Sequence, residues 1–220
     1  EKCDTYLKKT GLKRTDIIRS FDDPIGTNGA IAILRGNIAP DGAVVKHSAV
    51  PKEMHKALLK ARPFNCEEDA IHAILTHHIQ PGDAVIIRYE GPRGSGMPEM
   101  FYTTEAISSD PELSASIALL TDGRFSGASK GPAIGHISPE AAQGGPIALI
   151  EENDLIEIDI PQRILRVVGI NGEKCSEEEV QRVFNERRKA LPPFKSRYTH
   201  GVLKRFTQTA HSPMQGGYMD

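Results

Sequence analysis

The chain has 220 residues, of which 39% are hydrophobic and 25% are charged, and its formal net charge at pH 7 is −2. This is the composition of an ordinary soluble globular protein, long enough to bury a substantial core as one large domain or two small ones. No run of about 18 apolar residues occurs, so we expect no membrane-spanning segment.

Cysteine usage favours a reducing, cytoplasmic location. Cys3, Cys66 and Cys175 are odd in number and widely separated, which argues against a disulfide framework and against a complete metal site built from these three residues. No secretory signal peptide is recognisable. Because the chain begins with Glu1 rather than Met, we expect a fragment or a processed chain.

Short apolar runs typical of β-strands dominate the chain. Five of them are predicted as separate strands: 30–36, 42–49, 83–89, 116–122 and 145–151. The last three are continuously apolar, as expected of strands that are covered on both faces. Residues 155–160 and 163–170 alternate more clearly on either side of Pro161-Gln162, which predicts a hairpin with one face in water.

Two helices are marked by capping boxes, in which a Glu follows the cap residue by three positions. The first is predicted to run from Asn65 to the Pro-Gly pair at 81–82, and the second from Ser176 to the Pro-Pro pair at 192–193. Ser138-Pro139-Glu140 predicts a further short helix. This mixture predicts an α/β (mixed) fold, with a sheet curled toward a barrel and flanked by helices. Residues from about 191 to 220 show no clear period, and we expect an irregular tail that wraps over the body.

A basic stretch lies between Gln181 and Phe206. It contains one acid, Glu186, and eight basic residues: Arg182, Arg187, Arg188, Lys189, Lys195, Arg197, Lys204 and Arg205. Aromatic residues among them would allow RNA binding. Such a stretch is more often a solvated helix face followed by a tail that packs on an acidic body or partner subunit, and we favour that interpretation over a nucleic-acid partner.

The segment ALLTDGRFSGASKG (118–131) places a dense group of polar residues directly after an apolar run. A strand that ends at Asp122 presents the following side chains at the carboxyl edge of the sheet, where open α/β folds bind ligands. Gly123 and Gly127 allow close approach of the backbone to a ligand. A nucleophile elbow is not indicated, because Arg124 stands where that motif needs a glycine before Ser126. The alternative is a glycine-rich connector whose polar side chains satisfy backbone groups.

A second polar loop, IRYEGPRGSGMPEM (87–100), also follows an apolar run, and it carries Glu90, Arg93 and Glu99. We expect the two loops to meet at one edge of the sheet. A carboxylate beside hydroxyl groups suits Mg²⁺, which takes oxygen ligands and is often held by one or two carboxylates. The alternative for Glu99 is an ion pair with a nearby arginine.

Four segments carry a resemblance to a known family. They are GNIAPDGAVVKHSAV (36–50), RYEGPRGSGMPEM (88–100), ALLTDGRFSGAS (118–129) and GHISPEAAQGGPIALI (135–150). In this order they resemble the C-terminal domain of the dihydroxy-acid/phosphogluconate dehydratases, over about residues 21–170. Residues 97–136 look most like the sugar-acid branch of that family, in particular the xylonate dehydratases.

The resemblance implies a hydro-lyase that removes water from a 2,3-dihydroxy acid, such as the sugar acid xylonate, and yields a 2-keto-3-deoxy acid. It implies two cofactors, an iron–sulfur cluster and Mg²⁺. Ser126 matches the serine that takes the proton from C2, Glu99 matches a Mg²⁺ ligand, and Ser129 matches a hydroxyl residue close to the substrate. We further expect Gly127 and Arg124 to contact the substrate. Backbone N–H groups around Gly123 and Gly127, with a nearby cation that is either Lys130 or Arg124, are expected to ease deprotonation of Ser126.

The resemblance also implies that the cluster cysteines and most Mg²⁺ ligands lie in an N-terminal domain that nothing in 1–220 matches. We therefore expect residues 1–220 to form one swivelling β/β/α domain, a flattened β-barrel with flanking helices, which is inactive alone and works with its N-terminal domain in a homodimer or homotetramer. Two alternatives stay open: a dihydroxy-acid dehydratase of branched-chain amino acid synthesis, and a non-catalytic barrel that binds an anion or a partner.

Overall fold

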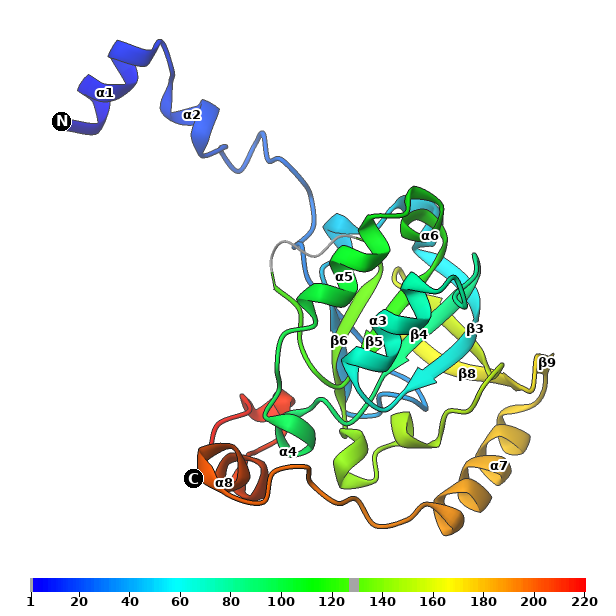
Figure 1. Ribbon diagram of the computed structural model, residues 1–220. Coiled ribbons are helices and arrows are strands. Elements are labelled where there is room, and N and C mark those ends of the chain that lie inside the picture. The colour runs from blue at the N-terminus through cyan, green and yellow to red at the C-terminus, as the bar shows by residue number, and fades with distance from the viewer. Residues whose placement is uncertain (1, 127–130) are drawn as a thin grey trace. The chain divides into compact units, whose positions relative to one another are not determined.

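The computed structural model describes residues 2–126 and 131–220 (Figure 1). Contacts divide the chain into two compact units, Glu1–Ala30 and Ile31–Asp220. The first contains helices α1 (Lys2–Thr10) and α2 (Arg14–Ile17), neither of which buries a residue. The second unit, called the body, contains the sheet and the polar loops.

The body is built on a nine-stranded sheet with the order β1-β2-β6-β5-β4-β3-β7-β8-β9. Its strands are β1 (Ala32–Leu34), β2 (Gly42–Val45), β3 (Lys56–Phe64), β4 (Asp83–Ile87), β5 (Ala118–Thr121), β6 (Ala133–Ser138), β7 (Leu155–Asp159), β8 (Ile164–Ile170) and β9 (Glu173–Lys174). Strands β3, β4, β5 and β6 are parallel neighbours, and the other pairs are antiparallel. The expected mixed α/β sheet is confirmed, as is the β7–β8 hairpin.

The sheet curls until its first strand reaches its eighth. Arg35, directly after β1, donates its N–H to the carbonyl of Arg163 and accepts from the N–H of Leu165, each at 2.8 Å. A Cβ on the next residue, Gly36, would lie 2.0 Å from the carbonyl oxygen of Leu165, so only glycine allows this approach. These contacts account for the barrel-like curl expected from the sequence.

Apolar side chains of the central strands serve two cores. Ala84 and Ile86 of β4 face the interior of the curled sheet, whereas Val85 and Ile87 belong to a second cluster outside it. Helices α3 (Glu67–Leu75), α5 (Phe101–Ser108) and α6 (Pro111–Ser116) cover that second cluster (Figure 1). Burial on both faces explains why these strands are continuously apolar.

Helix α7 (Glu177–Ala190) follows the sheet and packs on β8. Ser176 is its N-cap and accepts from the Glu179 N–H, as its sequence predicts. Helix α3 begins later than predicted, with Cys66 as its N-cap, because the Asn65 side chain instead accepts a hydrogen bond from Arg88. The segment after Ser138-Pro139 forms only a short 3₁₀-helix, Ala141–Gln143.

One predicted strand is wrong. Within 145–151, residues Pro146–Leu149 form a 3₁₀-helix. Its apolar residues are as fully buried as those of a central strand, and a short apolar run does not distinguish the two. A Cβ on Gly145 would lie 1.9 Å from the carbonyl oxygen of Pro139, so only glycine fits directly before this 3₁₀-helix.

The C-terminal part is more regular than expected. The predicted irregular tail contains helix α8 (Gly201–Thr209), which packs beside the short helix α4 (Pro92–Ser95) (Figure 1). Within the basic stretch, Arg187 pairs with the buried Asp154 of the body. The expected solvated helix face is therefore only partly right, because Arg187 is largely buried, whereas the expected packing of the tail on an acidic group is seen where Arg197 pairs with the buried Glu90. Among the described helices, none is both long and apolar enough to cross a lipid bilayer.

The contact between Asn37 and β8 generates a stability prediction. The Asn37 amide donates to the carbonyl of Val167 at 2.9 Å and accepts from the N–H of the same residue at 2.8 Å. We expect Asn37→Ala to lower the free energy of unfolding by about 1–3 kcal/mol, because it leaves two partly buried backbone groups unpaired. Urea unfolding should show this loss, whereas Asn28→Ala, at an exposed position, should change the free energy of unfolding little. Equal losses in the two variants would show that the hydrogen bonds between Asn37 and β8 do not stabilise the fold.

Candidate functional site

The two polar loops leave the sheet side by side. Strands β4 and β5 are parallel and in register, with Ile87 opposite Thr121, so the chain segments that follow them emerge at the same edge. Further along, the backbones of Glu99 and Arg124 form an isolated parallel β-bridge. In it the N–H of Met100 donates to the carbonyl of Arg124 at 3.0 Å. The expected meeting of the Glu99 loop with the bend after β5 is therefore observed.

Asp122 joins this bend to its neighbours. Its carboxylate is fully buried and accepts backbone hydrogen bonds from Tyr89 at 3.1 Å, Glu90 at 2.9 Å and Ala141 at 2.8 Å. Burial raises the pKa of Asp122 to about 6, although the three N–H donors oppose that shift by favouring the charged form. One side chain thus connects the end of β5, the loop after β4 and the turn after β6.

Glu140 plays a similar part on the other side of the loop after β4. Its buried carboxylate accepts from the N–H of Arg93 at 3.0 Å and of Gly94 at 2.9 Å, at the start of α4. A Cβ on Gly91 would lie 2.5 Å from one of its oxygens, which explains glycine at that position. Burial raises the pKa of Glu140 to about 7, against the effect of these two donors. From the sequence, Glu140 was expected only at the start of a short helix, and its role in holding the loop after β4 was not predicted.

The bend itself holds Arg124 exposed and Ser126 partly exposed. Between them Phe125 packs against the second apolar cluster and over Gly135. The carbonyl of Gly123 accepts from the N–H of His136 at 2.8 Å, which ties the bend to β6. Burial, and secondly the charge of Arg124, lower the pKa of the His136 side chain.

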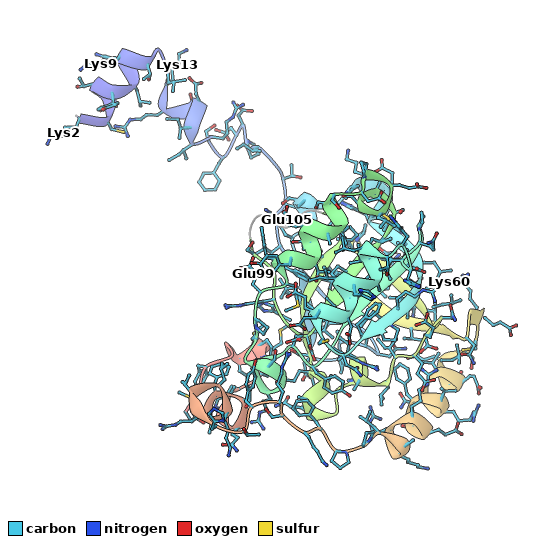
Figure 2. All side chains as sticks on the ribbon, viewed as in Figure 1. Lys2, Lys9, Lys13, Lys60, Glu99 and Glu105 are labelled. Carbon is cyan, nitrogen blue, oxygen red and sulfur yellow. The ribbon has the colours of Figure 1, made fainter. Side chains whose placement is uncertain are left out.

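Of the predicted site residues, the structure therefore brings Glu99, Arg124 and Ser126 to one edge of the body. Gly127 and Ser129 lie outside the described residues. Figure 2 shows Glu99 at the surface just ahead of α5. Within the described chain its carboxylate has no ion-pair partner, so the alternative of a Glu99–arginine pair finds no support.

A Mg²⁺ ion is compatible with Glu99 only if other oxygen ligands come from elsewhere. In residues 2–126 and 131–220, no group of three or more His, Cys, Asp or Glu side chains is arranged to hold a metal. Mg²⁺ commonly uses one or two carboxylates together with water and substrate oxygens, so a single exposed carboxylate fits a partial site.

The cysteines do not fit an iron–sulfur cluster. All three are free thiols: Cys3 lies in α1, Cys66 caps α3 and Cys175 precedes α7. Burial raises the pKa of Cys66 to about 11, which favours the thiol over the thiolate that a cluster requires. Any cluster that works with this body would take its ligands from outside these residues.

The three hydrogen bonds of Asp122 predict that replacing its carboxylate by an amide destabilises the fold. Asp122→Asn would place an amide NH₂ against at least one of the three N–H donors, so we expect a loss of about 1–3 kcal/mol in the free energy of unfolding. Asp41→Asn, at an exposed position, is the matched control. Chemical unfolding measures both, and a variant as stable as the control would show that the three contacts are dispensable.

The raised pKa of Glu140 predicts how the stability of the fold depends on pH. Because the pKa of Glu140 is about 7 in the fold against an ordinary 4.5, the folded state binds this proton more tightly than the unfolded chain. The resulting stability is fully present below about pH 4.5 and is lost as the pH rises through 7.

We therefore expect the unfolding free energy of the wild type, measured relative to that of Glu140→Gln, to decrease as the pH rises from 4.5 to 7.5. Glu53→Gln, which alters an exposed carboxylate, should run parallel to the wild type. Parallel curves for Glu140→Gln as well would contradict the raised pKa.

The sequence is similar to those of known proteins over most of its length. The family model described as Dihydroxy-acid/6-phosphogluconate dehydratase C-terminal matches residues 16–217. A dihydroxy-acid dehydratase of Lachnoclostridium phytofermentans is 50% identical over 206 residues, and one of Methanosarcina barkeri is 48% identical over 206 residues. A third, from Maridesulfovibrio salexigens, is 48% identical over 207 residues.

These alignments cover 93–94% of this chain but only 35% of each relative. The chain thus spans about a third of the length of the curated relatives it matches. On the extent of the family match, the chain belongs to the dihydroxy-acid/6-phosphogluconate dehydratase family and corresponds to its C-terminal part.

Proposed function

We propose that this chain is the C-terminal part of a hydro-lyase that converts a 2,3-dihydroxy acid into a 2-keto acid. The reaction removes the C2 proton and the C3 hydroxyl as water, and the resulting enol tautomerises to the ketone. The observation that carries the proposal is the pairing of the Glu99 loop with the bend that holds Ser126.

Each of the predicted site residues has a role in this proposal. Ser126, as its alkoxide, accepts the C2 proton. A serine hydroxyl is a weak base, so Arg124, exposed two residues away, supplies positive charge that lowers the cost of the alkoxide. The Gly127 backbone and the Ser129 hydroxyl contact the substrate, as the family resemblance suggests.

Glu99 is assigned as one Mg²⁺ ligand, because it is an exposed carboxylate without an ion-pair partner in the described chain. When bound, Mg²⁺ supplies Lewis-acid stabilisation of the charge that develops at the substrate carboxylate and C2 hydroxyl. An iron–sulfur cluster would take its ligands from the proposed N-terminal domain, and when bound it would supply Lewis-acid chemistry for the C3 hydroxyl.

The substrate is proposed as a 2,3-dihydroxy acid of the kind named in the relatives. The sequence resemblance favours a sugar acid such as xylonate, but the similar proteins are named dihydroxy-acid dehydratase. The alternative considered there, a dihydroxy-acid dehydratase of branched-chain amino acid synthesis, is therefore the better supported choice. We further propose a cytoplasmic enzyme in which residues 1–220 act as one domain with an N-terminal domain, in a homodimer or homotetramer.

The role of Ser126 is tested by Ser126→Ala in the full-length enzyme. We expect kcat to fall about 10²- to 10⁴-fold, because general-base catalysis is lost, while the absorbance of the cluster is retained. Ser109→Ala, which removes an exposed hydroxyl at the end of α5, should leave turnover unchanged. Turnover near the wild-type rate in Ser126→Ala would remove this serine from the mechanism.

Substrate class is tested by assaying the full-length enzyme against a branched aliphatic 2,3-dihydroxy acid and a panel of sugar acids that includes xylonate. Preference for the branched acid is expected, and preference for xylonate would restore the sugar-acid assignment. No turnover with any acid, combined with specific binding of an anion or protein by the isolated chain, would favour the non-catalytic barrel.

A further inference from the structure

A buried carboxylate lies in the same loop as Glu99. Glu90 follows β4, and its side chain is only 2% exposed. Its two oxygens accept from one guanidinium nitrogen of Arg197, at 2.8 and 2.7 Å, and one of them also accepts from the Ser95 hydroxyl. Arg197 is separated from Glu90 by 107 residues and is the one cation paired with it among the described ion pairs.

Arg197 belongs to residues 191–200, which connect α7 to α8 and which we call the strap (Figure 1, orange). The strap touches the loop after β4 a second time, because the ring of Phe194 stacks on that of Tyr89 with centroids 5.3 Å apart and planes at 6°. Beyond α8, the carbonyl of Ala210 accepts from the Arg93 side chain at 2.8 Å. Three contacts thus join the C-terminal part of the chain to one short loop.

The strap and the loop together line an open pocket of about 340 Å³. Its lining includes Tyr89, Gly94, Phe194 and Arg197. The Arg197 side chain itself remains 45% exposed. Leu191, at the start of the strap, packs against the apolar core, and beyond it the strap meets the loop through one ion pair and one ring stack.

The other charges near this pair do not replace Arg197. Asp122, which binds the N–H groups of Tyr89 and Glu90, is a second buried carboxylate and repels Glu90. Glu68 attracts Arg197 from α3 but adds no positive charge. Without Arg197, Glu90 would be an unbalanced buried anion beside another, which is a strongly unfavourable arrangement. The loop would have to move so that Glu90 reaches water.

We propose that Arg197 is a positioning residue for the dehydration reaction: by neutralising Glu90, it holds the loop after β4 where Glu99 meets the bend that carries Ser126. This inference rests on the proposed function, because it assigns importance to Glu99 and Ser126. It gives the basic stretch a role within the enzyme, since Arg197 acts on the site loop from within the strap.

The test uses the full-length enzyme with Arg197→Met, Arg197→Lys and the double variant Arg197→Met/Glu90→Gln. Lys195→Met is the matched control, because Lys195 lies in the strap and is exposed. The first measurement is hydrogen exchange in peptides covering residues 88–100, which needs no activity. The second is the Mg²⁺ concentration that gives half-maximal turnover, compared with KM for the organic acid.

For Arg197→Met we expect faster exchange in 88–100 and a half-saturating Mg²⁺ concentration raised about 10- to 100-fold, the usual effect of losing a group that supports a metal ligand. The double variant should return both quantities close to wild type, since the neutral amide introduced by Glu90→Gln needs no cation, and Arg197→Lys should fall between. Lys195→Met should match the wild type. Unchanged exchange and unchanged Mg²⁺ dependence in Arg197→Met would overturn the inference.

A double variant as impaired as Arg197→Met would also overturn it, because the effect would then come from lost packing and not from the charge of Glu90. Should Arg197→Met fail to fold, the inference requires the double variant to fold, and failure of both refutes it. If the wild-type enzyme dehydrates no acid, the proposed function fails, while the exchange measurement still decides whether Arg197 holds the loop.

Discussion

The site depends on one buried anion, the carboxylate of Asp122. Strand β5 ends in the interior of the protein, and three backbone N–H groups from two other segments end there as well. Buried donors without acceptors are costly, and a carboxylate with two oxygens accepts all three at once. Because the donors belong to the loop after β4 and the turn after β6, satisfying them also determines where the loops lie. The cost of burying the charge is visible in the raised pKa of Asp122.

Neighbouring carboxylates divide into structural and functional groups according to their surroundings. Glu90 and Glu99 lie in one loop, nine residues apart. Glu90 is buried and neutralised by Arg197, whereas Glu99 is exposed and has no ion-pair partner in the described chain. A carboxylate that already has donors and a cation is a poor candidate for a metal, and an exposed one retains its lone pairs for that purpose. The same loop thus provides both an anchor and a candidate ligand.

Sequence patterns predicted this architecture where the determining interactions are local. Ser176 caps α7 because its acceptor and donor lie three residues apart, and the β7–β8 hairpin follows from alternation around a short turn. The meeting of Glu99 with the bend was predictable, because continuously apolar strands that run in parallel end at one edge. Assigning 145–151 to a strand failed because full burial hides the difference between a strand and a 3₁₀-helix. The contacts of Asp122, Glu140 and Arg197 span 19 to 107 residues, and no local pattern reveals them.

We propose that the Glu99 loop and the Ser126 bend form one half of a single reaction site. A crystal structure of the full-length protein with Mg²⁺ and a non-reacting analogue of a 2,3-dihydroxy acid would show whether they do. We expect a Glu99 oxygen about 2.1 Å from the metal and the Ser126 hydroxyl next to the hydrogen on C2 of the analogue. A metal held only by other residues, with Ser126 remote from the bound acid, would contradict it.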